Sequence, residues 1–446
     1  MGDNRTMRFV STGARCALPA LLLIVAGGVG LAGCGKVPAA DRPDGGSGGG
    51  DGAVDASGPV TVTLTNQRVS GQTGNAALVA VQDGDGPWQA VSGTDGVYRA
   101  SVSAARYGTF VACERARDGA VFVALGFYAV SDGTERYTID YCALENPVGV
   151  MISGTVSGTQ MGDSLWISDG FKETAGAITN WSIEAFAGPG TLIGMKMVNN
   201  RPTAMLLQRV TFAAGATFNL DFANQFFPAE SDLTLDPTGT TTFMSTYYVD
   251  ETGGEHRIDF TDKPVTKYRV VPADRVGGGM LLLSQNTGSN GAIREVLRAF
   301  KAPTAQVLTL PAAFLLPTPP RIATRTPYVI AEATLPRRAA ASYYAVNYFT
   351  QDNNVFRSWD TTYSAAWAAA VPGADLVTRL PDLSGVPGWK ASYGLSEKGG
   401  SWNVGVGTGP PRFMPGAARY DFRGKSLAPH LDGDETTTSY STGPLQ

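Results

Sequence analysis

Residues 97–142 read VYRASVSAARYGTFVACERARDGAVFVALGFYAVSDGTERYTIDYC, and residues 180–222 read NWSIEAFAGPGTLIGMKMVNNRPTAMLLQRVTFAAGATFNLDF. Each stretch opens with an aromatic residue in an alternating apolar run, passes a Gly-Thr-apolar step, and closes on an apolar-Asp-aromatic triplet. Alternation of apolar and polar residues, bounded by Gly and Asp, is typical of half-buried strands. The two stretches therefore predict an internal repeat of an all-β unit.

Further copies of this pattern are weaker. A third begins at Tyr268 and closes by Pro311, and a fourth is expected to close on Arg379-Leu380-Pro381. Each copy is long enough for a two-sheet sandwich of about seven short strands. We therefore predict an all-β fold of tandem β-sandwich domains.

The predicted division of the chain follows from these copies and from composition. It comprises a signal peptide at 1–33, a disordered Gly/Asp/Ser tether at 34–58, sandwich repeats at 59–145, 146–230 and 231–317, a divergent Trp- and Tyr-rich β-domain at 318–424, and a polar tail at 425–446 that is expected to be disordered. Short helices are expected only at Gly291 to Lys301 and at Tyr363 to Val371.

The N-terminus has the features of an export signal. Arginines precede an apolar run from Ala17 to Leu31, and the run ends in Leu31-Ala32-Gly33-Cys34. This tetrapeptide resembles the lipobox of bacterial lipoproteins. The resemblance implies cleavage before Cys34 and attachment of a diacylglycerol, with its palmitate-type chains, to the Cys34 thiol. Stable anchoring takes two or more acyl chains.

The address implied by the lipobox is the cell envelope. Membrane lipid, reached through Cys34, is the expected partner there, and Gly35 in place of Asp favours the outer membrane, with the periplasmic and surface faces both open. Two alternatives remain, an uncleaved membrane anchor and an ordinary signal peptide with a coincidental cysteine. The apolar run is shorter than the roughly 20 residues of a spanning helix.

Two cysteines remain in the predicted mature domains, Cys113 and Cys142. An exported chain meets an oxidising compartment, so a Cys113–Cys142 disulfide is predicted, with two buried thiols as the alternative. Closing a loop of this length would stabilise the fold by roughly 3.5 kcal/mol in the chain-entropy model.

The second copy opens with Ile152-Ser153-Gly154-Thr155-Val156. This pentapeptide resembles the first strand of carboxypeptidase-regulatory-like, or transthyretin-like, sandwiches. The resemblance implies that topology for the repeats, while an immunoglobulin-like topology is equally compatible with the pattern.

Composition restricts the partners. The 446 residues carry a formal net charge of −4 without long charge runs, which argues against a nucleic-acid partner because such proteins present a basic stripe. No metal site and no cofactor site are predicted, since the two histidines, His256 and His430, lack ligand spacing. His256 lies in a polar stretch and is expected to be a solvated surface residue. The Asp-Gly turns at Asp83 to Gly86 and at Asp432 to Asp434 are assigned to tight turns in preference to calcium loops.

No catalytic residue is predicted. Gly162-Asp163-Ser164-Leu165 resembles the nucleophile block of GDSL esterases, which take their base from an Asp-x-x-His motif. Neither histidine is preceded by Asp at that spacing, so a turn between strands is preferred. Asp140 and Asp221 recur in the closing strands, and recurrence favours a structural turn or cap bond for both.

The C-terminal aromatic residues are the strongest binding candidates. Four of the seven tryptophans, Trp359, Trp367, Trp389 and Trp402, fall in the divergent domain. They are candidates for a binding platform for a glycan or an envelope protein. The alternative is that they fill a β-sandwich core.

The expected function is a lipid-anchored cell-envelope protein with tandem β-domains, structural, adhesive or ligand-presenting and not catalytic. The alternative is an enzyme acting on polysaccharide or cell wall, or a carbohydrate-binding protein, with its site in the Trp-rich domain.

Overall fold

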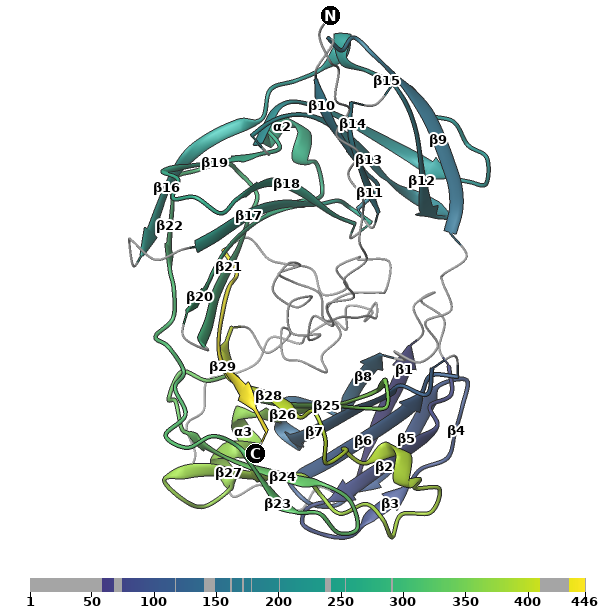
Figure 1. Ribbon diagram of the computed structural model, residues 1–446, viewed down its shortest axis with the longest axis vertical. Coiled ribbons are helices and arrows are strands. Elements are labelled where there is room, and N and C mark those ends of the chain that lie inside the picture. The colour runs from purple at the N-terminus through teal and green to yellow at the C-terminus, as the bar shows by residue number, and fades with distance from the viewer. Residues whose placement is uncertain are drawn as a thin grey trace, which may run out of the picture. The chain divides into compact units, whose positions relative to one another are not determined.

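The computed structural model describes residues 58–67, 74–116, 118–139, 149–160, 163–170, 172–177, 179–199, 201–236, 242–252, 254–289, 292–409 and 433–445. These residues form strands almost throughout, which confirms the predicted all-β class (Figure 1). Cys34, Cys142, His430 and the predicted signal peptide lie outside them, as does the tether up to residue 57.

The chain repeats one order of strands three times, and we name the three groups units A, B and C. Unit A contains β1 (Val60–Gln67), β2 (Leu78–Asp83), β3 (Trp88–Ala90), β4 (Gly93–Thr94), β5 (Val97–Val102), β6 (Arg106–Glu114), β7 (Val121–Ala129) and β8 (Glu135–Ile139), with the 3-10 turn η1 (Val130–Asp132). Unit B contains β9 (Gly149–Ser157), β10 (Ser164–Ser168), β11 (Glu173–Gly176), β12 (Asn180–Phe186), β13 (Gly188–Val198), β14 (Arg201–Phe212), β15 (Leu220–Asp221) and η2 (Phe222–Asn224). Unit C contains β16 (Ala229–Asp236), β17 (Thr242–Val249), β18 (Glu255–Thr261), β19 (Lys267–Val270), α2 (Ala273–Val276), β20 (Met280–Ser289), β21 (Ala292–Phe300) and β22 (Gln306–Thr309).

One sheet of each unit is built around its first strand. That strand pairs antiparallel with the strand that carries the repeated aromatic residue and parallel with the closing strand. The triplets are β5-β1-β8, β12-β9-β15 and β19-β16-β22. Tyr98, Trp181 and Tyr268 occupy equivalent strands and are all buried. The repeat read from the sequence is therefore a repeat of structure.

The other sheet of each unit has four strands in a constant order, β3-β2-β6-β7, β11-β10-β13-β14 and β18-β17-β20-β21. Apolar residues from both sheets meet between them. In unit B, for example, Ile152 and Ile183 of one sheet share a core with Ile167 and Leu192 of the other. Because side chains alternate across a strand, every second residue enters this core. Each unit is thus a β-sandwich.

The C-terminal part has a different order. It contains β23 (Arg321–Thr324), β24 (Ile330–Pro336), β25 (Tyr343–Asp352), β26 (Val355–Ser364), α3 (Ala365–Ala370), β27 (Asp375–Arg379), η3 (Ala391–Tyr393), β28 (Ser401–Thr408) and β29 (Glu435–Pro444). The predicted helix at Tyr363 to Val371 is confirmed as α3, whose first turn is capped by the Ser364 hydroxyl accepting from the Trp367 amide at 3.1 Å. The predicted helix at Gly291 to Lys301 is wrong, because Ala292–Phe300 is β21, paired on both sides.

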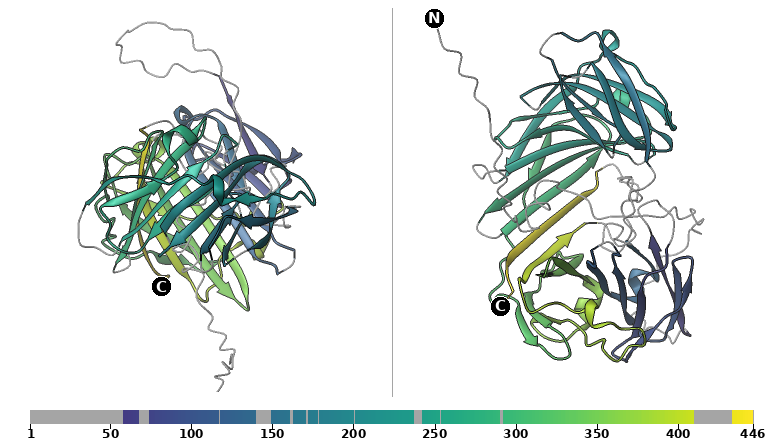
Figure 2. Two further views of the ribbon diagram at one scale, coloured as in Figure 1. Left: turned by 90° about the horizontal axis from the view of Figure 1, so that it is seen from above. Right: turned by 45° about the vertical axis from the view of Figure 1, so that its right-hand side comes forward.

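A twelve-stranded sheet joins strands that are far apart in sequence. Its order is β18-β17-β20-β21-β29-β28-β25-β26-β7-β6-β2-β3. The strand β7 of unit A pairs in parallel with β26, and β21 of unit C pairs antiparallel with β29. The expectation of a disordered tail is wrong for 435–444, since β29, the yellow strand of Figures 1 and 2, lies between β21 and β28.

Units A and C each share a core with neighbouring elements. Phe110 and Val123 of unit A pack in one cluster with Trp359 and Val404 of the C-terminal part. Met195 and Met205 of unit B pack with Tyr248 and Ile258 of unit C, together with the other members of that cluster. Within the described ranges, no helix has the length and apolarity required to span a bilayer.

Candidate functional site

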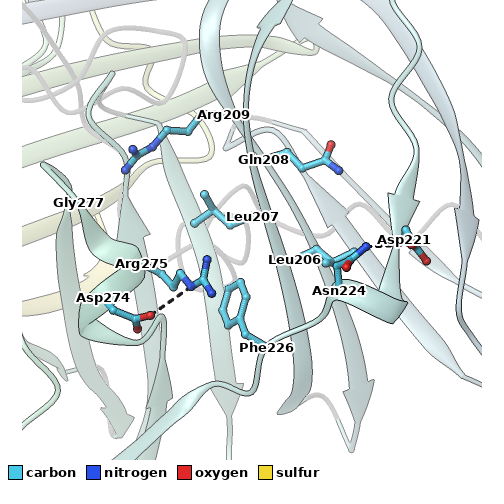
Figure 3. Close-up of a pocket in the computed structure, with 10 residues that line it drawn as sticks. All are labelled: Leu206, Leu207, Gln208, Arg209, Asp221, Asn224, Phe226, Asp274, Arg275 and Gly277. Atoms are coloured by element: carbon cyan, nitrogen blue, oxygen red, sulfur yellow. Dashed lines mark hydrogen bonds and ion pairs between the residues drawn. The ribbon is translucent and has the colours of Figure 1, made fainter.

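A cleft of about 470 Å³ runs along strand β14 and faces the short helix α2 (Figure 3). This volume lies within the range of ligand-sized sites. The residues that line it are Leu206, Leu207, Gln208, Arg209, Asp221, Asn224, Phe226, Asp274, Arg275 and Gly277. Four consecutive residues of β14 form one wall, and α2 with its C-terminal glycine forms the opposite wall.

Strand β14 is the last strand of its sheet. It forms a long antiparallel hairpin with β13, and on its other side only one isolated bridge is found among the described residues, between Met205 and Phe226. The amide of each of these two residues donates to the carbonyl of the other, at 2.8 and 2.9 Å. The cleft begins where this bridge ends.

Two guanidinium groups dominate the polar lining, and each already has a carboxylate. Arg209 lies 2.9 Å from the Oε1 atom of Glu251, which also accepts from the Gly278 amide at 2.9 Å. Arg275 lies 3.3 Å from Asp274 and stands over the Phe226 ring at 5.5 Å, an arrangement that Figure 3 shows. The pairing leaves little net charge, so the cleft suits a polar, uncharged group better than a phosphate.

Gly277 makes room for this arrangement. Its φ is +60°, and a Cβ there would stand 2.2 Å from a terminal nitrogen of Arg209. Glycine is the residue that adopts this backbone conformation without strain, and here it also leaves the space that the guanidinium occupies.

Asp221 and Asn224 form the far end of the cleft. The Asp221 carboxylate accepts from the Ala223 amide at 3.1 Å and from the Asn224 side-chain amide at 3.0 Å, which caps η2. The structural cap role predicted for Asp221 is therefore confirmed, whereas Asp140 lies outside the described residues. Gln208 donates from its side-chain amide to the Asn219 carbonyl at 3.0 Å.

The turn behind Glu251 holds a buried histidine–aspartate pair that the sequence did not predict. His256 is 0% exposed, so the expectation of a solvated surface histidine is wrong. Its Nε2 atom lies 3.6 Å from Oδ2 of Asp250, which is 5% exposed, and its ring stacks on Tyr248 with centroids 6.0 Å apart. The separation of 3.6 Å is longer than a direct hydrogen bond.

Asp250 is held as a carboxylate. Its Oδ1 atom accepts from the Thr252 amide, the Thr252 hydroxyl and the Gly254 amide at 2.8, 2.7 and 2.9 Å. Burial alone would raise the pKa of Asp250, but the facing imidazole of His256 and the hydroxyls of Thr252 and Thr191 outweigh it and hold that pKa well below its usual range. The His256–Asp250 pair is buried, and it stabilises the turn that positions Glu251 beside the cleft.

The four tryptophans of the predicted platform are not displayed together at the surface. Trp359 and Trp402 are 0% and 5% exposed, and their indole N–H groups donate to the Tyr393 and Pro444 carbonyls at 2.7 and 2.8 Å. Trp367 and Trp389 are partly buried and pack against the same core cluster. The core alternative accounts for these residues, and the cleft along β14 contains no tryptophan.

Other predicted positions have structural surroundings. Cys113 is buried on β6, and its pairing with Cys142 stays a prediction because Cys142 is outside the described residues. Asp83 accepts from the Ser103 and Ala104 amides at 3.0 and 2.8 Å, as expected of a turn residue. Ser164 of the GDSL-like block starts β10 and is exposed.

Metal ligands do not gather in the described part of the chain. Its His, Cys, Asp and Glu side chains form no group of three or more that could hold an ion. None of the ten residues lining the cleft is a serine, cysteine or histidine, and its two carboxylates are those of Asp221 and Asp274.

The comparisons with known proteins give little. The sequence matches no family model and no curated protein. Two solved structures that align with it are the Bacillus anthracis TIE protein, at 9% identity over 89% of this chain and 73% of that one, and the streptococcal ancillary pilin, at 9% identity over 56% and 98%. Both alignments have a TM-score of 0.14, at which the paths of the chains differ, so we draw no functional inference from either.

Proposed function

We propose that this protein is a lipid-anchored, non-catalytic component of the bacterial cell envelope, whose β-units present a surface to a structural or adhesive partner. The observation that supports this most directly is the burial of histidine and tryptophan side chains. His256, Trp359 and Trp402 are buried in the fold, and Trp367 and Trp389 are partly buried against the same core.

The anchor rests on the sequence around Cys34. The lipobox resemblance and the Gly-rich stretch that follows it imply a lipidated cysteine at the end of a flexible linker. As a random coil, that linker would hold the first sandwich roughly 25 Å from the bilayer on average. We place the protein at the outer membrane on the same basis.

The anchor is tested by metabolic labelling with an alkyne analogue of palmitate, followed by membrane fractionation. The parent protein is expected to be labelled and membrane-bound, and Cys34→Ala to be unlabelled and soluble. Cys16→Ala, which changes a cysteine inside the predicted signal, is the matched control and should keep the label. Label retained in Cys34→Ala, or membrane binding without label in the parent, would show that the lipoprotein assignment is wrong.

The non-catalytic role is tested with isolated cell-wall sacculi and envelope polysaccharide. Saturable retention of the purified protein, with no release of soluble reducing ends, is the expected result. Release of reducing ends would instead favour the polysaccharide-acting enzyme, which is the alternative function. Absence of retention on any envelope fraction would remove the adhesive role.

A further inference from the structure

We propose that the outer edge of β14 binds an extended polypeptide segment of a partner protein, which adds to unit B as a further strand inside the cleft. The inference names the partner of the ligand-presenting role proposed above and rests on that role, but not on the lipid anchor. It is carried by the repeat itself, by the direction of the β14 backbone and by the walls of the cleft.

The three units give an internal comparison of one sheet edge. In the constant four-strand order, the last strands are β7 in unit A, β14 in unit B and β21 in unit C. The outer edge of β7 is covered by β26 over seven paired positions, from Arg357↔Val121 to Tyr363↔Phe127. The outer edge of β21 is covered by β29 in the same way, from Ala292↔Ser441 to Arg298↔Glu435.

The equivalent edge of β14 has no such strand among the described residues. Within the described ranges its backbone forms one bridge, between Met205 and Phe226, and near its start the Pro202 carbonyl accepts from the Arg269 side chain at 2.9 Å. An exposed row of backbone N–H and C=O groups is a template for pairing with another chain. Two of three equivalent edges use that template within this chain, so we infer that the third uses it on a partner.

The backbone direction of β14 supports this assignment. Both backbone bonds of Met205 go outwards to Phe226, so Met205 sits at a position that is not hydrogen-bonded to β13. The β13–β14 register runs without a shift from Met205 to Phe212, so Leu207 and Arg209 also direct their N–H and C=O groups outwards. Both residues line the cleft, and no outward backbone bond is found for either within the described ranges.

The walls of the cleft select the form of the partner. Helix α2 and Phe226 lie across the cleft from β14. In this proposal they admit a single extended chain and obstruct the edge of a folded sheet. A peptide that continues the ladder beyond Phe226 would alternate its side chains between two environments. One environment contains Arg209 and Arg275, and the other contains Asp221 and Asn224 at the far end of the cleft.

The test begins with the purified full-length protein and a phage-displayed library of random nonapeptides, followed by synthesis of the selected sequences. We expect saturable binding of synthetic peptides by fluorescence polarisation. N-methylation at alternate peptide residues should abolish binding for one set of positions and leave the other set unchanged, because only every second amide faces β14. Dependence on the peptide backbone with a period of two distinguishes strand addition from side-chain recognition.

Two proline variants give a matched pair. Leu207→Pro removes an outward amide inside the cleft without removing a bond to β13, and the affinity for the peptide should fall about tenfold. Thr211 lies on the same strand beyond the cleft lining, and its amide also faces outwards. Thr211→Pro removes that amide and should bind the peptide with an affinity within about twofold of the parent. If Leu207→Pro fails to fold, amide hydrogen exchange on the parent protein still decides, since Leu207 and Arg209 should exchange rapidly when free and at least tenfold more slowly with peptide bound.

Several outcomes would overturn the proposal. These are no saturable peptide from the library, equal effects of N-methylation at all positions, Leu207→Pro binding as tightly as the parent, or amides of Leu207 and Arg209 already protected in the free protein. Concentration-dependent dimerisation that Leu207→Pro abolishes would place a second copy of this chain at the edge instead. Binding by the unlabelled, soluble Cys34→Ala protein would leave strand addition standing even if the anchor fails.

Discussion

Replacing His256 with alanine should destabilise the protein by about 3 to 5 kcal/mol. The imidazole is fully buried and faces the carboxylate of Asp250, so the substitution removes the facing partner of an enclosed carboxylate and leaves a cavity. Three hydrogen bonds to the Oδ1 atom of Asp250 remain, from Thr252 and Gly254, and these place the expected loss at the lower end, about 3 kcal/mol.

The effect should depend on pH in a defined direction. The folded-state pKa of Asp250 lies below its unfolded value of about 3.9, so the folded state favours the charged carboxylate. The stability that this contributes is fully present above the unfolded pKa and is lost as the pH falls through the folded one. Urea unfolding of the parent and of His256→Ala should therefore differ more at about pH 6 than at about pH 3, and the difference should narrow below about pH 4.

A double-mutant cycle makes the reasoning refutable. Asp250→Asn, His256→Ala and the double variant should show a coupling energy of about 1 to 3 kcal/mol. Ile258→Ala, on the same face of β18 and equally buried, is the control, since it should lower stability by about 2 to 5 kcal/mol without changing the pH dependence. A coupling energy under about 0.5 kcal/mol, or a loss from His256→Ala that stays constant from pH 6 to pH 3, would refute the charged-pair account.

Three further predictions follow from other contacts. Arg201 donates to the fully buried Asp259 through two nitrogens, at 3.0 and 2.6 Å. Arg201→Met should lower the free energy of unfolding, measured by chemical denaturation, by about 3 to 5 kcal/mol. Arg201→Lys cannot bind in the same bidentate way and should lower it by about half as much. Cys142→Ser should lower stability by roughly 3.5 kcal/mol if the bond to Cys113 forms, and intact mass under non-reducing conditions should show the parent two protons lighter than its reduced form. Deleting β29 uncovers the edges of β21 and β28, and size-exclusion chromatography should show aggregation, whereas a chain that stays monomeric and fully folded would mean that β29 is dispensable.

The repeated sandwich could be predicted because its signals are local. An aromatic residue at a fixed place in an alternating run, such as Trp181, marks a strand whose neighbours follow within the same unit. Helix α3 was also readable, because an alanine-rich run follows the capping Ser364. The apolar spacing of Ala292–Phe300 also fits a helix, which is why the sequence predicts the wrong conformation there. Pairing with β20 and β29 decides its conformation, and tertiary context overrides local preference there.

The expectations for His256 and for the tail fail for the same reason, which is that polar composition does not by itself imply exposure. His256 and Ile258 lie two residues apart on one strand, so they face the same side, and the buried isoleucine carries the histidine into the interior. That alternation was a signal available in the sequence. In the same way Thr436 to Tyr440 is rich in β-branched and aromatic residues, which favour strands despite their polarity.

The joining of sheets lies beyond sequence reasoning on one chain, because β7 meets β26 and β21 meets β29 across more than a hundred residues. No local sequence pattern indicates such long-range pairings, so they become visible only in the folded structure. Three copies of one sheet end in strands of equivalent position, two of those edges are covered by other parts of the chain, and the third faces a cleft. An uncovered edge is ordinarily a liability for aggregation, and short strands, charges or covering elements blunt it. On β14 the paired Arg209 and helix α2 line the cleft beside the open edge. We propose that they limit the approach to a single extended strand, as a selective binding edge requires.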